Sequence, residues 1–224
     1  MNQARERLQD RAAAVGLDLD AWSVERLLVY FELLRRWNRR LNLTGLRVED
    51  GSDESIDRLL IEPVLARRLA GTVGNVIDVG SGGGSPVIPF ALGLTPAPRL
   101  TLVESRSKKS TFLREAIREA GLDGRVVTGR FEEVAERPEE AGAHSALTIR
   151  AVRTDPELWL AAHKVLASDG RAYWFHGDGQ EFPGNSGFEW ASSVPLVPSL
   201  RSFLSVGLPA LGSPDVSRET SEPR

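Results

Sequence analysis

The segment IDVGSGGGSPVIPFAL, from Ile77 to Leu92, decides the fold class of this chain. An apolar, β-like run carrying Asp78 leads into a glycine-rich loop, and an apolar stretch with two prolines follows the loop. This order of strand, glycine loop and helix is typical of nucleotide sites, because bare backbone and a helix N-terminus can approach a ligand closely. The segment therefore predicts a nucleotide-like ligand at the end of a buried strand.

The spacing of the glycines excludes two common nucleotide motifs. Glycines occupy positions 80, 82, 83 and 84, so Ser85 stands at the third position of a G-x-G-x-x-G fingerprint. A P-loop requires Gly-Lys-Ser/Thr, which does not follow here. Asp78 would be unfavourable beside a pyrophosphate but favourable beside an ammonium and a sulfonium. The loop therefore favours S-adenosylmethionine over NAD.

A second acid supports a nucleoside ligand. Glu104 ends the next predicted strand about twenty residues after the middle glycines, where a carboxylate accepts hydrogen bonds from ribose hydroxyls. Sites for NAD and for S-adenosylmethionine share this acid, so it does not choose between them. If the chain has no ligand site here, Asp78 is a solvated loop acid and Glu104 is an ion-pair partner of Arg106. Ser85 and Pro86 are the predicted N-cap and first residue of the following helix.

The rest of the chain divides into a helical part and an alternating part. Apolar residues recur at helical spacing from 4 to 70, and Pro63 predicts a kink or a break in the last helical segment. After Gly74, β-like and helical runs alternate, which predicts a mainly parallel sheet with helices on both faces. The expected strands are 75–79, 99–104, 125–128, 145–150 and 171–175, and the expected helices are 86–92, 108–120 and 156–167. Two further β-like runs, 188–194 and 200–206, predict an antiparallel hairpin at the sheet edge.

We therefore expect a helical region at 1–70, an α/β domain at 71–211 and a disordered tail at 212–224. The 224 residues include no cysteine, which excludes disulfides, thiolate metal sites and a cysteine nucleophile. No stretch approaches the ~20 apolar residues of a membrane span, and the charged N-terminus is unlike a signal peptide. The three histidines show no metal spacing. These features predict a cytoplasmic protein with neither a membrane nor a metal partner.

Positive charge is concentrated in two short regions. The net charge of −3 argues against a uniformly basic nucleic-acid binder, yet arginines crowd 35–47 and a second basic cluster spans 106–109. Phosphate binding responds to the local potential more than to the total charge. A solvated helix face explains either cluster alone equally well. The candidate RNA-binding residues are Arg36, Arg39, Arg40, Arg47, Lys108 and Lys109.

Five segments carry a resemblance to a known family. They are WNRRLNLTG (37–45), IDVGSGGGSPVIP (77–89), ESRSKKSTFLREAIREAGL (104–122), GRFEEV (129–134) and IRAV (149–152). Together and in this order they resemble the GidB/RsmG family of bacterial methyltransferases, which modify guanine N7 in small-subunit ribosomal RNA. The shared order excludes a chance glycine loop.

This resemblance implies a fold, a reaction and a set of site residues. The fold would be a Rossmann-like sheet of the S-adenosylmethionine-dependent methyltransferases, preceded by an N-terminal helical region. The reaction would be direct in-line transfer of a methyl group to guanine N7 of 16S ribosomal RNA, which needs positioning but no general base, because N7 carries a free lone pair. The candidate cofactor-binding residues are Asp78, Gly80, Gly82, Gly84, Ser85, Glu104, Phe131, Glu132 and Arg150.

Two residues are candidates for the catalytic rim. Arg150 lies in the segment IRAV, and Asn42 lies in WNRRLNLTG. Within the pocket, the resemblance implies that Glu104 binds the ribose and that Phe131 and Glu132 flank the adenine. Read without the family, Asn42 would be a loop cap, Phe131 a core residue and Arg150 a member of an ion pair.

The chain departs from the family mainly on the side expected to meet RNA. In RLLIEP (58–63), Leu59 replaces a histidine and Glu62 an aspartate, while His176 replaces a lysine. Ser85 stands where the family places a larger apolar residue. The expected partner is 16S ribosomal RNA or the small ribosomal subunit, bound by a monomer. Two alternatives remain open: a divergent paralogue that methylates a small molecule or another RNA, and a non-catalytic RNA- or ribosome-binding relative.

Overall fold

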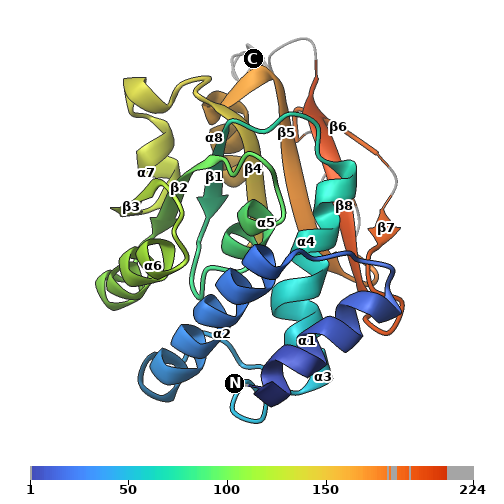
Figure 1. The fold of residues 1–224 in the computed structure, drawn as a ribbon. Helices are drawn as coiled ribbons and strands as arrows, with labels where there is room; N and C mark the ends of the chain where they lie inside the picture. Colours follow the sequence, from blue (N-terminus) through green and yellow to red (C-terminus); the bar gives the residue numbers. More distant parts are fainter. Residues whose placement is uncertain (1, 181, 183–185, 192, 211–224) are drawn as a thin grey trace, which may run out of the picture.

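A single mixed sheet organises the protein (Figure 1). The computed structural model describes residues 2–180, 182, 186–191 and 193–210, so the predicted tail at 212–224 lies outside the described residues. The strand order is β3-β2-β1-β4-β5-β8-β6, with β7 paired to β8. The strands are β1 (Asn75–Val79), β2 (Arg99–Glu104), β3 (Gly124–Thr128), β4 (His144–Arg150), β5 (Leu166–Gly177), β6 (Phe188–Trp190), β7 (Val194–Pro195) and β8 (Ser202–Pro209).

The strands from β1 to β5 are parallel, and the last three are antiparallel. This confirms the predicted mainly parallel sheet with an antiparallel edge. β8 lies between β5 and β6, so the final strand pairs directly with the parallel part of the sheet. The register sets Asp78 beside Thr148 and Arg150 beside Phe175. Side chains on neighbouring strands thereby meet at the carboxyl edge of the sheet.

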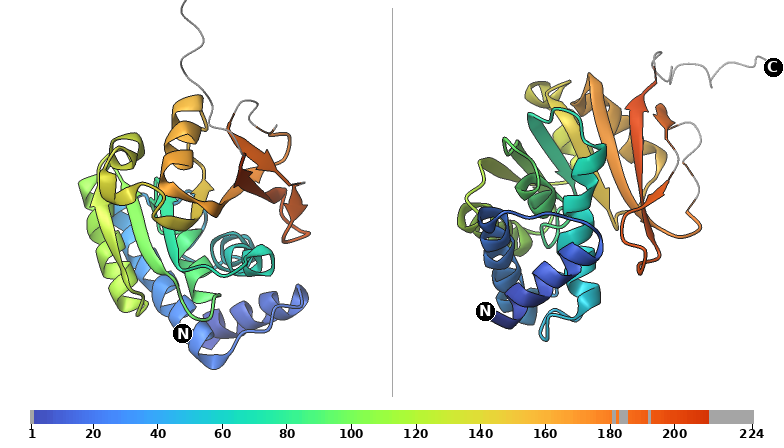
Figure 2. Two further views of the ribbon diagram at one scale, coloured as in Figure 1. Left: turned by 90° about the horizontal axis from the view of Figure 1, so that it is seen from above. Right: turned by 45° about the vertical axis from the view of Figure 1, so that its right-hand side comes forward.

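Helices cover both faces of the sheet (Figure 2). The helices are α1 (Asn2–Ala14), α2 (Ala21–Leu41), α3 (Asp53–Ile56), α4 (Glu62–Leu65), α5 (Val87–Leu92), α6 (Ser107–Glu119), α7 (Phe131–Ala135) and α8 (Pro156–Val165), with a π turn η1 (Asp57–Ile61) and 3₁₀ turns η2 (Ala66–Leu69) and η3 (Pro138–Glu140). Helices α1 to α6 share one apolar core with one face of the sheet, and α7 and α8 form a second core on the other face. None of the helices in the described ranges is long and apolar enough to cross a bilayer.

Helix α2 shows why the N-terminal region packs on the sheet. Asp20 caps it by accepting the backbone N–H of Ser23 at 2.7 Å, which satisfies one of the free donors of the first turn. The predicted apolar face is buried, with Leu27 and Leu34 fully enclosed. Asn42 ends the helix in the left-handed region, with φ 47°, and turns the chain toward the glycine loop.

Near Pro63, where the sequence predicted a kink or a break into two helices, a π turn separates α3 from α4. The chain remains helical from Asp53 to Leu69 but changes its hydrogen-bond spacing on the way. The N–H of Glu62 donates to the carbonyl of Asp57, five residues back, within the π turn. A proline removes one N–H from the helix, and this wider turn accommodates the loss.

Candidate functional site

A cleft of about 360 Å³ opens beyond the carboxyl ends of β1 and β4. Its walls come from the glycine loop, the turn after α2, the π turn and the end of β4. The lining residues are Leu34, Leu43, Thr44, Gly45, Leu46, Arg58, Leu59, Gly80, Ser81, Gly82, Gly83, Ser85, Lys109, Arg150 and Ala151. Open α/β sheets bind ligands at this edge, outside the carboxyl ends of their strands.

The glycine loop is shaped by tight packing and by left-handed backbone. Gly80 has φ +63°, and a Cβ there would lie 2.6 Å from Cγ1 of Val152. A Cβ on Gly84, at φ +83°, would lie 2.7 Å from Cδ1 of Ile88. Tyr30 of α2 donates its hydroxyl to the carbonyl of Gly83 at 2.6 Å and so ties the loop to the N-terminal region. A Cβ on Gly82, at φ +51°, would meet the carbonyl oxygen of Gly80 at 3.6 Å, an ordinary contact, so Gly82 is less tightly packed and presents bare backbone to the cleft.

Asp78 lies beneath this loop rather than on the cleft surface. Its carboxylate is 1% exposed and accepts a hydrogen bond from Oγ1 of Thr148 at 2.5 Å. Burial raises the pKa of Asp78 to about 7, while the hydrogen bonds from Thr148 and Ser81 and the charge of Arg150 oppose that shift. The structure therefore places this predicted cofactor residue one layer behind the lining, where it supports the loop.

Glu104 joins the end of β2 to the glycine loop. One carboxylate oxygen accepts the N–H of Gly82 at 2.9 Å, and the other accepts the N–H of Arg106 at 2.8 Å. The side chain is 6% exposed. A carboxylate offers about four acceptor positions, so two remain after these bonds. The acid is thus held rigidly, with acceptor capacity left over.

Arg150 is the most highly connected side chain of the cleft. Its guanidinium donates to the carbonyl of Arg58 at 2.7 Å, to Oγ of Ser85 at 3.2 Å and to the carboxylate of Glu62 at 2.6 Å. It also lies 4.5 Å from the ring centroid of Phe175. Burial lowers the pKa of Arg150 from its usual value, and the charge of Glu62 opposes that shift. The structure brings this predicted residue to the wall of the cleft.

Ser85 also lies in the wall, but its predicted role as a helix cap is wrong. Helix α5 begins at Val87 rather than at Pro86, and Pro86 stands at the cap position without a side-chain bond. The Ser85 hydroxyl instead donates to the carbonyl of Leu59 at 3.0 Å. A long-range acceptor therefore holds this hydroxyl away from the helix end.

Three other predicted residues lie beside the cleft without lining it. Phe131 and Glu132 begin α7 directly after β3, and Phe131 is buried in the second core. Both remain near Glu104, because the N–H of Gly129 donates to the backbone carbonyl of Glu104 at 3.1 Å. Asn42 acts as the C-cap of α2, and it is its neighbours from 43 to 46 that line the cleft.

Most of the predicted RNA-binding arginines are engaged in ion pairs. Arg36 pairs with Glu115, Arg39 with Glu49, and Arg47 with Asp50, at 2.7–3.0 Å. In the described part of the chain, Arg40, Lys108 and Lys109 form no ion pair. The structure thus divides the predicted RNA-binding cations into paired and available ones.

The sequence reasoning missed Arg58 as a cation of the cleft. Arg58 lines the cleft with Lys109 and forms no ion pair with another described residue. Among the described residues, the lining contains no Asp or Glu. Thr148 and Glu62, the partners of Asp78 and Arg150, were likewise not assigned to the site. Pro63, in the helical segment that carries Arg58 and Glu62, was the available signal.

The histidines serve structural contacts. His144 bonds to Glu140 at 2.9 Å, and His176 is buried and shares a hydrogen bond with Ser205 at 2.8 Å. Within the described ranges, the structure contains no group of three or more His, Cys, Asp or Glu side chains that could hold a metal ion.

Solved structures with the same architecture define the class of this fold. A SAM-dependent methyltransferase from Aquifex aeolicus matches with a TM-score of 0.58 at 10% identity, covering 72% of this chain and 96% of its own. A putative O-methyltransferase from Klebsiella pneumoniae matches with a TM-score of 0.57 at 15% identity, covering 81% of this chain and 90% of its own. The protein therefore has the fold of the S-adenosylmethionine-dependent methyltransferases.

Sequence comparison identifies the family within this class. The chain belongs to the GidB family, described as rRNA small subunit methyltransferase G, whose model matches residues 23–183. The ribosomal RNA small subunit methyltransferase G of Neisseria meningitidis serogroup B is 43% identical over 135 residues, which are 60% of this chain and 63% of that protein. The corresponding protein of Xylella fastidiosa is 40% identical over 154 residues, 69% of each chain. The match thus spans less than two thirds of the Neisseria relative.

Proposed function

We propose that this protein is an S-adenosylmethionine-dependent methyltransferase that methylates guanine N7 in 16S ribosomal RNA of the small ribosomal subunit. The observation that carries the proposal is the cleft at the ends of β1 and β4, in a chain of the GidB family. This cleft combines a bare glycine backbone with unpaired cations. We place the activity in the cytoplasm, where ribosomal RNA is available.

Gly82 in the cleft and its hydrogen-bond partner Glu104, which does not itself line the cleft, fit the methyl donor. Gly82 presents a surface without a side chain, and Glu104 retains two acceptor positions suited to ribose hydroxyls. Phe131 and Glu132 begin α7, just after Gly129, whose N–H donates to the carbonyl of Glu104, and we assign them to the adenine. When bound, S-adenosylmethionine supplies a methyl group on a positively charged sulfur. Asp78 behind the loop contributes negative potential whenever it is ionised.

The residues of the cleft act by positioning. Arg150, Ser85 and the backbone of the glycine loop form a rigid wall, because each is held by hydrogen bonds to other elements. In-line transfer to a free lone pair needs this kind of alignment and no proton removal. Among the described residues, no Asp or Glu lines the cleft, and a reaction without proton removal needs none there.

The cations around the cleft fit a polyanionic acceptor. Arg58 and Lys109 line the cleft. Arg40, at the basic end of α2, lines a separate groove together with Arg36 and Trp37. Unpaired cations gain most from phosphate contacts, since paired ones must first give up their acidic partners. This arrangement supports RNA over a neutral small molecule as the acceptor.

Two measurements test the proposal separately. Calorimetry with S-adenosylmethionine tests the donor, and absence of binding at millimolar concentration would refute it. Incubation with labelled donor and small subunits that lack the modification, followed by mass-spectrometric mapping of the RNA, tests the acceptor. We expect one methylated guanine in 16S RNA. Methylation of another RNA or of a small molecule would favour the divergent paralogue, and RNA binding without any methylation would favour the non-catalytic relative.

A further inference from the structure

The π turn beside the cleft leaves two backbone carbonyls without the N–H partners that an α-helix would give them. In an α-helix, the carbonyl of Arg58 would accept the N–H of Glu62, and that of Leu59 would accept the N–H of residue 63. Here the N–H of Glu62 donates to Asp57 instead, and Pro63 has no N–H. The carbonyls of Arg58 and Leu59 are therefore free to accept hydrogen bonds from outside the helix.

Both released carbonyls are used by side chains of the cleft wall. The guanidinium of Arg150 donates to the carbonyl of Arg58 at 2.7 Å, and the hydroxyl of Ser85 donates to that of Leu59 at 3.0 Å. Arg150 also donates to the Ser85 hydroxyl. The irregular turn thus holds one residue from β4 and one from the glycine loop in a fixed relation.

Glu62 completes this arrangement from the next position of the same helical segment. Its side chain is fully buried, and its carboxylate accepts from Arg150 at 2.6 Å and from the hydroxyl of Ser202 on β8. A buried guanidinium is costly without a counter-charge, so the position of Glu62 determines where the guanidinium lies. These partners occupy three of the five N–H donors of Arg150, and two donors remain.

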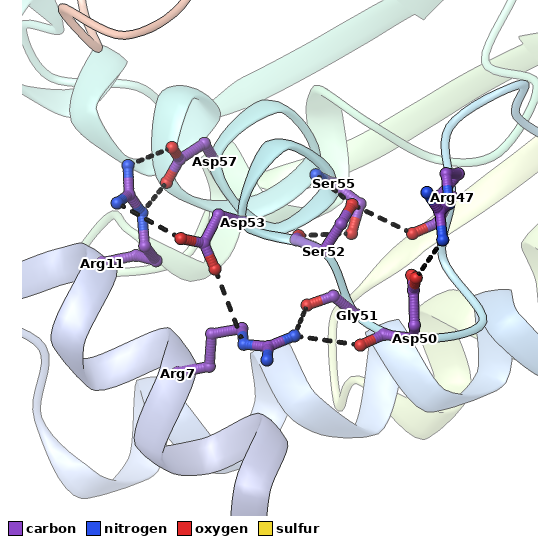
Figure 3. Close-up of polar contacts among 9 residues, drawn as sticks. All are labelled: Arg7, Arg11, Arg47, Asp50, Gly51, Ser52, Asp53, Ser55 and Asp57. Atoms are coloured by element: carbon purple, nitrogen blue, oxygen red, sulfur yellow. Dashed lines mark hydrogen bonds and ion pairs between the residues drawn. The ribbon is translucent and has the colours of Figure 1, made fainter.

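The turn itself is anchored from the N-terminal helix (Figure 3). Arg11 of α1 makes two hydrogen bonds to the carboxylate of Asp57, the first residue of the π turn, at 2.9 and 2.5 Å. Asp57 is 1% exposed, and Arg11 also lies 3.6 Å from Asp53. This paired charge holds the start of the turn, so the released carbonyls keep their direction toward Arg150.

We propose that Glu62 and the proline-bounded π turn Asp57–Ile61 are a positioning device that fixes the guanidinium of Arg150 in the wall of the cleft. The inference rests on the proposed function for its ligand, S-adenosylmethionine. Glu62 and Pro63 do not line the cleft. They act through Arg150 and Ser85, which do.

Two substitutions separate positioning from folding. Glu62→Ala removes the carboxylate that accepts from Arg150, and we expect the affinity for S-adenosylmethionine to fall at least tenfold, with Glu62→Gln recovering part of the loss. Pro63→Ala restores an N–H to the helix, so we expect the melting temperature to hold or rise while the affinity falls several-fold. A merely structural role would move stability and affinity in the same direction. Unchanged affinity in both Glu62→Ala and Pro63→Ala would overturn the inference.

Matched controls come from other parts of the chain. Glu140 is also fully buried and paired with an arginine, Arg125, at 2.6 Å, but it lies near the amino end of β4. Glu140→Ala should lower the melting temperature and leave the affinity unchanged. Pro156→Ala, at the first turn of α8, should change neither. In a double-mutant cycle, Glu62→Ala should add no further loss of affinity to Arg150→Ala, because both act through one guanidinium.

A measurement without ligand distinguishes this inference from the proposed function. In ¹⁵N spectra of the free protein, Arg150 should show separate, slowly exchanging Nη signals that merge in Glu62→Ala. Merged signals in the parent protein would overturn the positioning device. If the parent failed to bind S-adenosylmethionine, the proposed function would be refuted, and the spectra alone would decide the inference.

Discussion

The carboxylate of Glu104 accepts the backbone N–H of Gly82 at 2.9 Å, so the acid that ends β2 holds the glycine loop that follows β1. The same side chain secures the chain after its own strand through the N–H of Arg106. One residue therefore joins the two neighbouring strand ends that border the cleft. It keeps the loop in place before a ligand arrives.

Glu104→Ala is expected to weaken the binding of S-adenosylmethionine by roughly 1.5–3 kcal/mol, because it removes charged hydrogen bonds and releases the loop. Calorimetry measures the change. Glu119→Ala, at the exposed end of α6, is the matched control and should bind as the parent does. Equal affinities for both variants would contradict the assignment of Glu104 to the site.

Gly80→Ala is expected to destabilise the fold by about 2 kcal/mol, because the new Cβ would overlap Val152 and an alanine is strained at φ +63°. Thermal unfolding should show a fall of roughly 4–8 °C for a chain of this size. Gly74→Ala is the control, since a Cβ there meets nothing within 4 Å. Adding Val152→Ala should restore part of the stability by removing the overlap. A melting temperature equal to that of the control would show that the loop relaxes without cost.

Asp78→Asn is expected to stabilise the protein more at pH 8 than at pH 5. Burial raises the folded pKa of Asp78 to about 7 from an ordinary value of 3.8, so the folded state binds more protons between these values. The destabilising effect of ionised Asp78 is thus absent below about pH 4, grows with pH and is complete above about pH 7, with an upper bound of about 4 kcal/mol. Urea unfolding of parent and variant at several pH values measures it. A difference independent of pH would argue that the Asp78 carboxyl titrates at its ordinary pKa.

Arg40→Ala is expected to reduce RNA affinity and to lower the slope of log K against log salt by about one. Arg40 is exposed and forms no ion pair in the described part of the chain, so its loss exposes no acid. Arg39→Ala should cost more, because it also leaves Glu49 unpaired next to the RNA. Arg99→Ala, at the amino end of β2, serves as the control. Salt titrations of RNA binding by the parent and the variants measure these slopes. Equal slopes for Arg40→Ala and Arg99→Ala would exclude α2 from the RNA interface.

Local patterns predicted the elements of the sheet well, and the differences have physical causes. Strand β2 was predicted with its observed bounds, since a buried parallel strand is a short apolar run. Strand β5 begins at Leu166, five residues before the predicted start. The sequence Ser-Asp-Gly at 168–170 does not resemble a strand, and the early start depends on the pairing of Leu166 with His144 of β4. Helix α5 begins at Val87 because Ser85 is recruited by a distant carbonyl.

The sequence by itself determined the glycine loop, the order of strands and helices along the chain, and the family, because each depends on residues that are close together in the sequence. The tertiary structure alone decided which groups reach the cleft. Asp78 accepts a hydrogen bond from Thr148, 70 residues away, and Arg150 is held by Glu62, 88 residues away. The glycine loop therefore defines the kind of site. Its charges and its rigid wall follow from desolvation and from long-range hydrogen bonds, which no local pattern records.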